Sequence, residues 1–183
     1  MKKIIFSSII LLMSAVLAFS QTISSLDHIQ FKGMPVDGTL AQFSSNLEKA
    51  GLPVVSLDKT SLTAIHHGSF AGYDDCTITV LSCPKDMSDY VYCISVAIPC
   101  PDDLNQIQTE YQTLKELLTL KYNEPSTETN TLHKPESHAC NFQVPGGDIR
   151  LSVEESKGQP WLLLTYTDST NELIAFGSIL GDL

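Results

Sequence analysis

The chain has 183 residues, and its 21 Asp and Glu against 11 Lys and Arg give a formal net charge of −10. A surface this acidic argues against nucleic acid and against anionic membrane as partners. The length is enough for one domain with a substantial hydrophobic core.

Residues 1–20 have the pattern of a secretory signal peptide, with Lys2 and Lys3 before a long apolar run and a small-residue exit that ends at Ser20. The run is too short for a convincing membrane span, and no Cys lies at the exit to indicate a lipid anchor. Cleavage after Ser20 would leave one α+β domain, residues 21–183, and would change the net charge from −10 to −12. We expect this domain in the periplasm or outside the cell, where disulfides are permitted.

The mature chain is predicted to begin with a short edge strand over Ile29–Val36, because Pro35 excludes a central position in a sheet. A helix is predicted next, since Thr39 and Gln42 have the spacing of a capping box. Its apolar stripe consists of Leu40, Phe43, Leu47 and Ala50. The helix is expected to end at Gly51, with a proline shortly after it.

Two strands, Leu52–Leu57 and Leu62–Phe70, are predicted after this helix. The second strand contains His66 and His67, and Asp74-Asp75 follows a turn. Neighbouring residues of a strand point to opposite faces, so the two histidines cannot easily share one metal ion. We therefore expect no metal site here, with one histidine half-buried and the other exposed.

The centre of the fold is predicted to be a hairpin of two alternating strands, Cys76–Cys83 and Tyr90–Cys100. If the numbers of paired residues sum to 176, Ile78 faces Ile98 on an apolar face. Sums of 174 or 178 keep that apolar face intact. The other face is smaller and more polar, and it carries Thr77, Thr79, Leu81, Ser95 and Ala97.

The same register sets Cys76 opposite Cys100 and Cys83 opposite Cys93, which makes both pairs candidate disulfides. Directly opposed Cα atoms in a sheet lie within disulfide range. The alternative is that Cys76 and Cys100 are small buried hydrophobic residues. Cys140 would remain as the unpaired fifth cysteine.

The second half is predicted to open with an amphipathic helix over Leu104–Tyr122, which Asp102-Asp103 starts and Asn123 stops. A polar loop, residues 126–137, follows it. Strands are then expected at Phe142–Val144, Ile149–Val153 and Trp161–Tyr166. The last of these is apolar nearly throughout and suits a central strand. Asp168 can cap a final helix.

These elements predict an α+β fold of two tandem pseudo-repeats, each a helix followed by three or four antiparallel strands, with a C-terminal helix. The half-repeats would be residues 28–100 and 101–166. The first helix stripe recurs 71 residues later, as Tyr111, Leu114 and Leu118, which suggests a duplication. The alternative is that modules of one helix followed by antiparallel strands commonly look alike.

The run His28–Leu40, followed by Phe43, Leu47, Ser69–Tyr73 and Cys76–Ile78, resembles a group of uncharacterised secreted proteins of Gram-negative gut commensals. This resemblance covers most of the mature chain and implies no known activity and no site residues. The repeated pattern of helix, small-x-Pro and strands is also similar to the helix-grip repeats of β-lactamase-inhibitor-like proteins and of small outer-membrane assembly factors. That resemblance is at the level of fold, and it implies a concave sheet surface that binds another protein.

No catalytic elbow, phosphate loop, dinucleotide fingerprint or zinc-protease motif is present, so we expect no catalytic, cofactor-binding or metal-binding residues. Cys140 with His138 is the only local pair suited to a nucleophile and its base. An acidic chain in an oxidising compartment is a poor setting for a reactive thiol. Tyr73, Tyr90 and Tyr92 are candidates for an exposed partner surface, and the alternative is that they pack inside.

The sequence as a whole favours a secreted, soluble, non-catalytic module that binds a protein, a peptide or a glycan. One alternative is an assembly or folding factor for envelope proteins. The other is a thiol- or metal-dependent enzyme that uses Cys140 or a histidine site. We expect no nucleic-acid partner, no cofactor and no membrane span.

Overall fold

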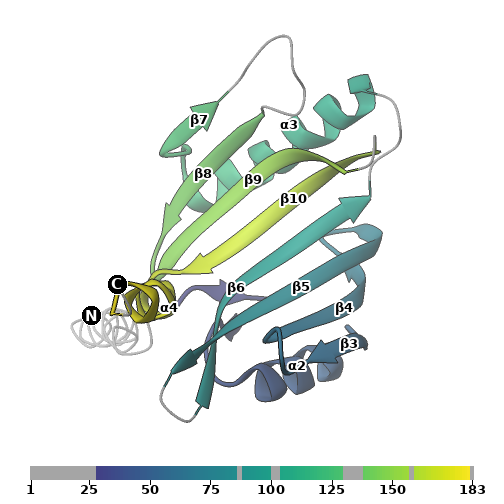
Figure 1. The fold of residues 1–183 in the computed structure, drawn as a ribbon. Coiled ribbons are helices and arrows are strands. Elements are labelled where there is room, and N and C mark those ends of the chain that lie inside the picture. The colour runs from purple at the N-terminus through teal and green to yellow at the C-terminus, as the bar shows by residue number, and fades with distance from the viewer. Residues whose placement is uncertain (1–27, 86–87, 100–103, 130–137, 157–158, 182–183) are drawn as a thin grey trace, which may run out of the picture.

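A computed structural model describes residues 28–85, 88–99, 104–129, 138–156 and 159–181, so the predicted signal peptide of residues 1–20 lies outside the described residues. Eight antiparallel strands form one twisted sheet in the order β3-β4-β5-β6-β10-β9-β8-β7 (Figure 1). The strands are β3 (Val54–Asp58), β4 (Thr63–Phe70), β5 (Tyr73–Lys85), β6 (Ser88–Pro99), β7 (Thr127–Thr129), β8 (Ala139–Val144), β9 (Gly147–Ser156) and β10 (Gln159–Asp168).

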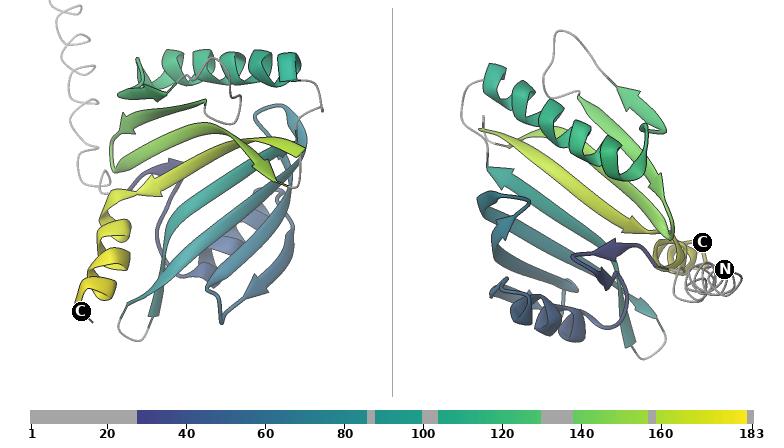
Figure 2. Two further views of the ribbon diagram at one scale, coloured as in Figure 1. Left: turned by 45° about the horizontal axis from the view of Figure 1, so that its top comes forward. Right: turned by 180° about the vertical axis from the view of Figure 1, so that it is seen from behind.

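Two helices cover one face of this sheet. Helix α2 (Leu40–Lys49) packs on β4, β5 and β6, and α3 (Leu104–Tyr122) packs on β8, β9 and β10. The right-hand view of Figure 2 shows both helices on the same side. A third helix, α4 (Ser169–Gly181), continues from the end of β10 and contacts β5 and β6.

A small hairpin fills the space between α2 and α3 on the same side of the sheet (Figure 2). It consists of β1 (Gln30–Phe31) and β2 (Met34–Pro35), which pair only with each other. The Phe31 ring stacks on Phe70 with centroids 5.5 Å apart and meets Tyr166 edge-on at 5.1 Å. The predicted edge strand is therefore a separate hairpin that closes the core.

Helices α2 and α3 form where the local sequence signals place them. Thr39 Oγ1 accepts a hydrogen bond from the Gln42 backbone N–H at 3.3 Å, and the Gln42 side chain accepts one from the Thr39 N–H at 3.4 Å, so the capping box is confirmed. Asn123 has a left-handed φ of 68° directly after α3, as a helix stop requires. The helix residues that are buried against the sheet are Leu40, Phe43, Leu47, Ile107, Tyr111, Leu114 and Leu118.

The predicted fold class, an α+β fold of two tandem pseudo-repeats over 28–100 and 101–166, is wrong. The described residues are mostly β, with 53% strand and 28% helix, and the eight strands from β3 to β10 belong to one sheet. The physical reason is the pairing of β6 with β10, in which Leu164 lies opposite Val96 and Tyr166 opposite Ile94. This ladder joins the two groups of strands edge to edge, so neither group closes as a unit of its own.

The central hairpin is formed by β5 and β6, but its predicted register is wrong by two residues. Ile78 pairs with Val96 and Val80 pairs with Ile94, which is the sum of 174 that the apolar pattern left open. A bulge then shifts the pairing, so that Ser82 lies opposite Val91. Because the side-chain period of a strand is two, this register buries the same apolar face.

The predicted disulfide between Cys83 and Cys93 is not formed, because the register sets Cys83 opposite Tyr90 and Cys93 opposite Leu81. Cys76 is also a free, buried thiol, and its predicted partner Cys100 lies outside the described residues. Cys76 and Cys83 therefore behave as small buried residues with weak S–H donors, which point to backbone oxygens of Tyr73 and Tyr90.

Candidate binding surface

The sheet face opposite α2 and α3 has no helix over its centre in the described part of the chain. We call it the open face, and Figure 1 looks onto it, with strands β8 to β10 passing in front of α3. Residues that lie directly opposite each other in an antiparallel sheet point to the same side, so the register defines the side chains on this face. From β4, β5, β6 and β10 they are Thr63, Ile65, His67, Thr77, Thr79, Leu81, Cys93, Ser95, Ala97, Pro99, Trp161, Leu163, Thr165 and Thr167.

This central part of the open face carries no Asp, Glu, Lys or Arg. Charged residues make up 17% of the chain, so a set of this size would hold about two by chance. Most of these side chains are half-buried. The hydroxyl groups of Ser95 and Thr165 lie 3.3 Å apart and satisfy each other. The surface is therefore without charged side chains, partly apolar and rich in small hydroxyl side chains.

Charged residues flank this neutral centre on both sides. Asp58 lies opposite Thr63 on β3, and Arg150 and Glu154 lie opposite Thr165 and Trp161 on β9. The arrangement resembles that of many protein–protein interfaces, in which the core is depleted of charge and the rim is polar. The single tryptophan of the chain, Trp161, lies on this face beside Pro99.

Helix α4 closes one end of the open face. The Cys83 thiol points to the backbone oxygen of Asn171 in the first turn of α4, at 4.0 Å. Burial raises the pKa of the Cys93 thiol, and the nearby carboxylate of Glu172 raises it further. Both thiols are thus buried beside α4, and the raised pKa of Cys93 keeps that thiol protonated.

A buried carboxylate fixes the position of α4. Asp168 is fully buried; its Oδ1 accepts a hydrogen bond from the Asn171 N–H at 2.9 Å, and its Oδ2 accepts one from the Ile29 N–H at 2.9 Å. His28 Nδ1 lies 3.1 Å from the same Oδ2. The Asn171 amide in turn donates to the Val91 carbonyl at 2.9 Å. Asp168 therefore caps α4, as its sequence position predicted, and also ties α4 to the N-terminal hairpin and to β6.

The three tyrosines proposed from the sequence as a partner surface do not lie together. Tyr73 begins β5 and donates a hydrogen bond to the Glu110 carboxylate of α3 at 2.6 Å. Tyr90 pairs with Cys83 near the other end of β5. Burial raises the pKa of Tyr92, which lies close to the thiols beneath α4. All three are half-buried.

The histidines of β4 have separate environments. His66 is fully buried, with Nε2 3.0 Å from the Ser44 hydroxyl and Nδ1 3.0 Å from the Leu52 carbonyl, so both ring nitrogens have partners. His67 is exposed on the open face. Among the described residues no three His, Cys, Asp or Glu side chains are placed to hold a metal ion.

The candidate thiol pair lies in the core. Cys140 is fully buried, and burial raises the pKa of its thiol, which keeps it protonated. His138 is buried against the Tyr111 ring of α3, at 5.6 Å between centroids. The Tyr111 hydroxyl faces the Cys140 thiol without a well-formed hydrogen bond, and burial raises the pKa of that hydroxyl as well. The three side chains form a buried packing cluster, and the raised pKa of the Cys140 thiol does not suit a nucleophile.

Comparison of the chain with protein-family models, curated proteins and solved structures gave no match. The two resemblances drawn from the sequence therefore stay expectations. Within the described residues, the helices are too short or too polar to cross a bilayer.

The sequence did not predict that Trp161 and Leu163 lie on an uncovered face of the sheet. Their strand was expected to be covered on both faces because it is apolar nearly throughout. The structure covers only the face of Leu162 and Leu164, which are buried, and leaves Trp161 and Leu163 half-buried on the open face. The signal in the sequence that could have indicated an uncovered face was the second face of the predicted central hairpin, whose side chains are small and uncharged.

Proposed function

We propose that this protein is a secreted, non-catalytic module that binds another protein through the open face of its sheet. The observation that carries the proposal is the neutral centre of that face in a chain of net charge −10. A solvated face of an acidic protein has no physical need to exclude charge, whereas the core of an interface does. Trp161 and Leu163 supply the apolar anchors that a protein interface concentrates near its centre.

The size of the surface fits a protein partner. Four strands about 4.8 Å apart, each contributing about 20 Å of length, give a neutral patch of about 400 Å². A standard interface buries about 800 Å² on each partner, so the charged flanks on β3 and β9 would form the rest of the contact. The small side chains, mainly Thr, Ser and Ala, would allow close approach of a flat partner surface.

Binding through a neutral surface determines how the stability of the complex depends on salt concentration. Contacts at the neutral centre do not depend on ion pairing, while the flanking charges Asp58, Arg150 and Glu154 act mainly on the association rate and on partner choice. We therefore expect the complex to survive washing at about 1 M salt, where surface ion pairs are screened.

The test is affinity capture from an envelope extract with two matched variants. Leu163→Arg places a charge at the centre of the open face, and Leu120→Arg places the same charge on α3, where Leu120 is 85% exposed. We expect the partner captured by the unchanged protein to be lost with Leu163→Arg and kept with Leu120→Arg. Equal capture by the two variants, or no partner retained at high salt, would refute binding through the open face.

A further inference from the structure

Strand β3 forms one edge of the sheet, and all five of its residues are exposed. Six large hydrophobic residues are exposed in the described part of the chain, and three of them are on this strand. Val54 is 38% exposed, Val55 67% and Leu57 37%. So strong a concentration on one short strand sets β3 apart from the rest of the surface.

Natural proteins usually protect a sheet edge with charged residues, proline, a very short edge strand or a bulge, because an open edge pairs readily with other strands. Strand β3 is short and bulged, but from Val54 to Leu57 it has no charged residue and no proline, and the first charged residue is Asp58. A bulge between Val54 and Ser56 leaves Val55 out of the inner ladder with β4. The outer backbone groups of β3 have no neighbouring strand among the described residues.

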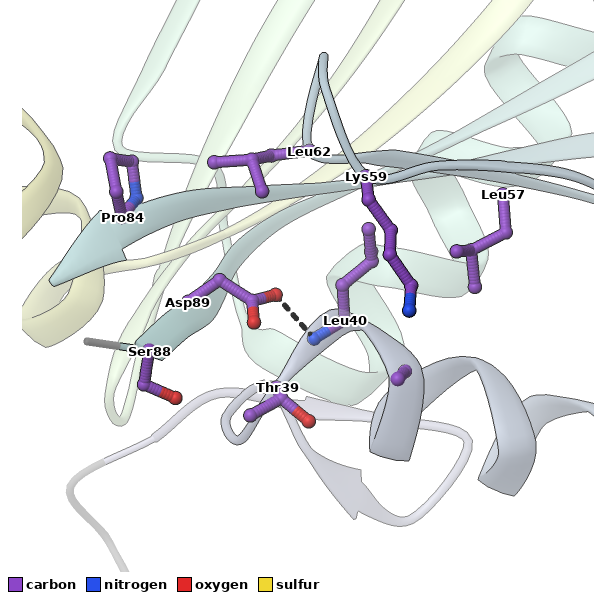
Figure 3. Close-up of a pocket in the computed structure, with 9 residues that line it drawn as sticks. Thr39, Leu40, Leu57, Lys59, Leu62, Pro84, Ser88 and Asp89 are labelled. Atoms are coloured by element: carbon purple, nitrogen blue, oxygen red, sulfur yellow. Dashed lines mark hydrogen bonds between the residues drawn. The ribbon is translucent and has the colours of Figure 1, made fainter.

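A hollow of about 380 Å³ adjoins this edge on the side of α2 (Figure 3). Leu40, Leu57 and Leu62 line it, together with Pro84. The carboxylate of Asp89 accepts a hydrogen bond from the Leu40 N–H at 2.7 Å, so the start of α2 is already satisfied. The hollow thus has a mixed lining, in which the leucines form an apolar wall next to the edge and Lys59, Ser88 and Asp89 form the polar part.

We propose that β3 pairs with β3 of a second copy of this chain, so that two eight-stranded sheets join edge to edge. Antiparallel pairing around a two-fold axis at Ser56 would place Val55 of one copy opposite Leu57 of the other, twice. Val55 of the second copy would then share the face of Leu57 and reach toward the hollow. Val55 and Leu57 of each copy would thereby gain an apolar neighbour across the new ladder, while Val54 would face Asp58.

Electrostatic repulsion between two copies is weakest at this edge. Two molecules of net charge −10 repel each other over most of their surfaces, and they can approach best where both are neutral. In the proposed register Asp58 lies opposite Val54, so the only acidic residue of β3 does not face its own copy. With the two-fold axis perpendicular to the sheet, the open faces of both copies would lie on one side. The pairing itself does not depend on the proposed function.

The interface is small, so the dimer is weak. A strand of five residues is about 17 Å long, and its contact stays well below the 800 Å² per partner of a standard interface. We expect a dissociation constant on the order of 100 µM, with monomer in dilute solution.

The experiment is sedimentation equilibrium of the purified exported protein from about 10 µM to about 1 mM. We expect reversible dimerisation, at least tenfold weaker in Val55→Lys and unchanged in Leu120→Lys. Both replaced residues are highly exposed, so both variants should fold, and circular dichroism checks this. Hydrogen exchange of the amides of residues 54–58 should slow as concentration rises. A monomer at every concentration, a dimer unaffected by Val55→Lys, or equal weakening by Leu120→Lys would overturn the proposal.

Discussion

Replacement of Asp168 by alanine should be the most destabilising single change at the polar anchor of α4. The carboxylate is fully buried and accepts hydrogen bonds from the backbone N–H groups of Ile29 and Asn171, each at 2.9 Å, with His28 Nδ1 at 3.1 Å. Alanine leaves these donors without the acceptor and removes the cap of α4. A buried donor without a partner costs about 1–3 kcal/mol and loss of a helix cap about 1 kcal/mol, which gives about 2–4 kcal/mol in total.

The assay is urea unfolding of Asp168→Ala beside the exposed control Glu116→Ala, with the free energy of unfolding taken from linear extrapolation. We expect a loss of about 2–4 kcal/mol for the first variant and less than about 0.5 kcal/mol for the second. Asp168→Asn keeps the size of the side chain and one acceptor oxygen, so it should fall between them. A loss below about 1 kcal/mol for Asp168→Ala would show that the anchor does not hold the N-terminal segment and α4 together.

Three further changes test other parts of the structure. Gly146→Ala should cost at least about 2 kcal/mol, because the added Cβ would lie 2.5 Å from a backbone carbon of His28 and φ is +82°. The control Gly72→Ala has a similar φ of +89° but open space around the added Cβ, so it should cost about 1 kcal/mol. Equal losses of stability in thermal unfolding would refute the close contact at Gly146. Burial raises the pKa of Asp148, so its charged form is disfavoured in the folded state, and the resulting stability is lost as pH rises from the unfolded pKa through the folded one. Asp148→Asn should therefore raise the midpoint of thermal unfolding at pH 7 and lose that advantage near pH 3, where the wild-type carboxyl is protonated; a gain that persists at pH 3 would contradict this. Tyr111→Phe removes a buried hydroxyl without a hydrogen-bond partner, so the free energy of unfolding should stay the same or rise by up to about 1 kcal/mol, and a clear loss in urea titration would show a hidden partner.

The parts of the fold that were predicted from the sequence are those set by local chemistry. The capping box at Thr39 and Gln42, the stop at Asn123 and the stripes of α2 and α3 act over a few residues, so the sequence contains their full cause. The cap at Asp168 was found for the same reason.

The parts that were missed depend on distant segments. The two-residue error in the hairpin register arose because a shift of two preserves the apolar face, and the candidate cysteine pairs then favoured the wrong alternative. The pairing of β6 with β10 joins residues about seventy positions apart, such as Tyr166 and Ile94, and leaves no local signal. That ladder made one sheet from two expected repeats, and it also brought Trp161 and Leu163 beside the small neutral face of β5 and β6.

Site-specific photo-cross-linking in living cells tests the binding role of the open face most directly. A photoreactive amino acid in place of Thr79 lies at the centre of the open face, and one in place of Glu116 lies on the exposed side of α3. The account predicts one defined cross-linked protein from position 79 that disappears when Leu163→Arg is added, and none from position 116. The absence of a cross-link at position 79, or the same product from both positions, would contradict it.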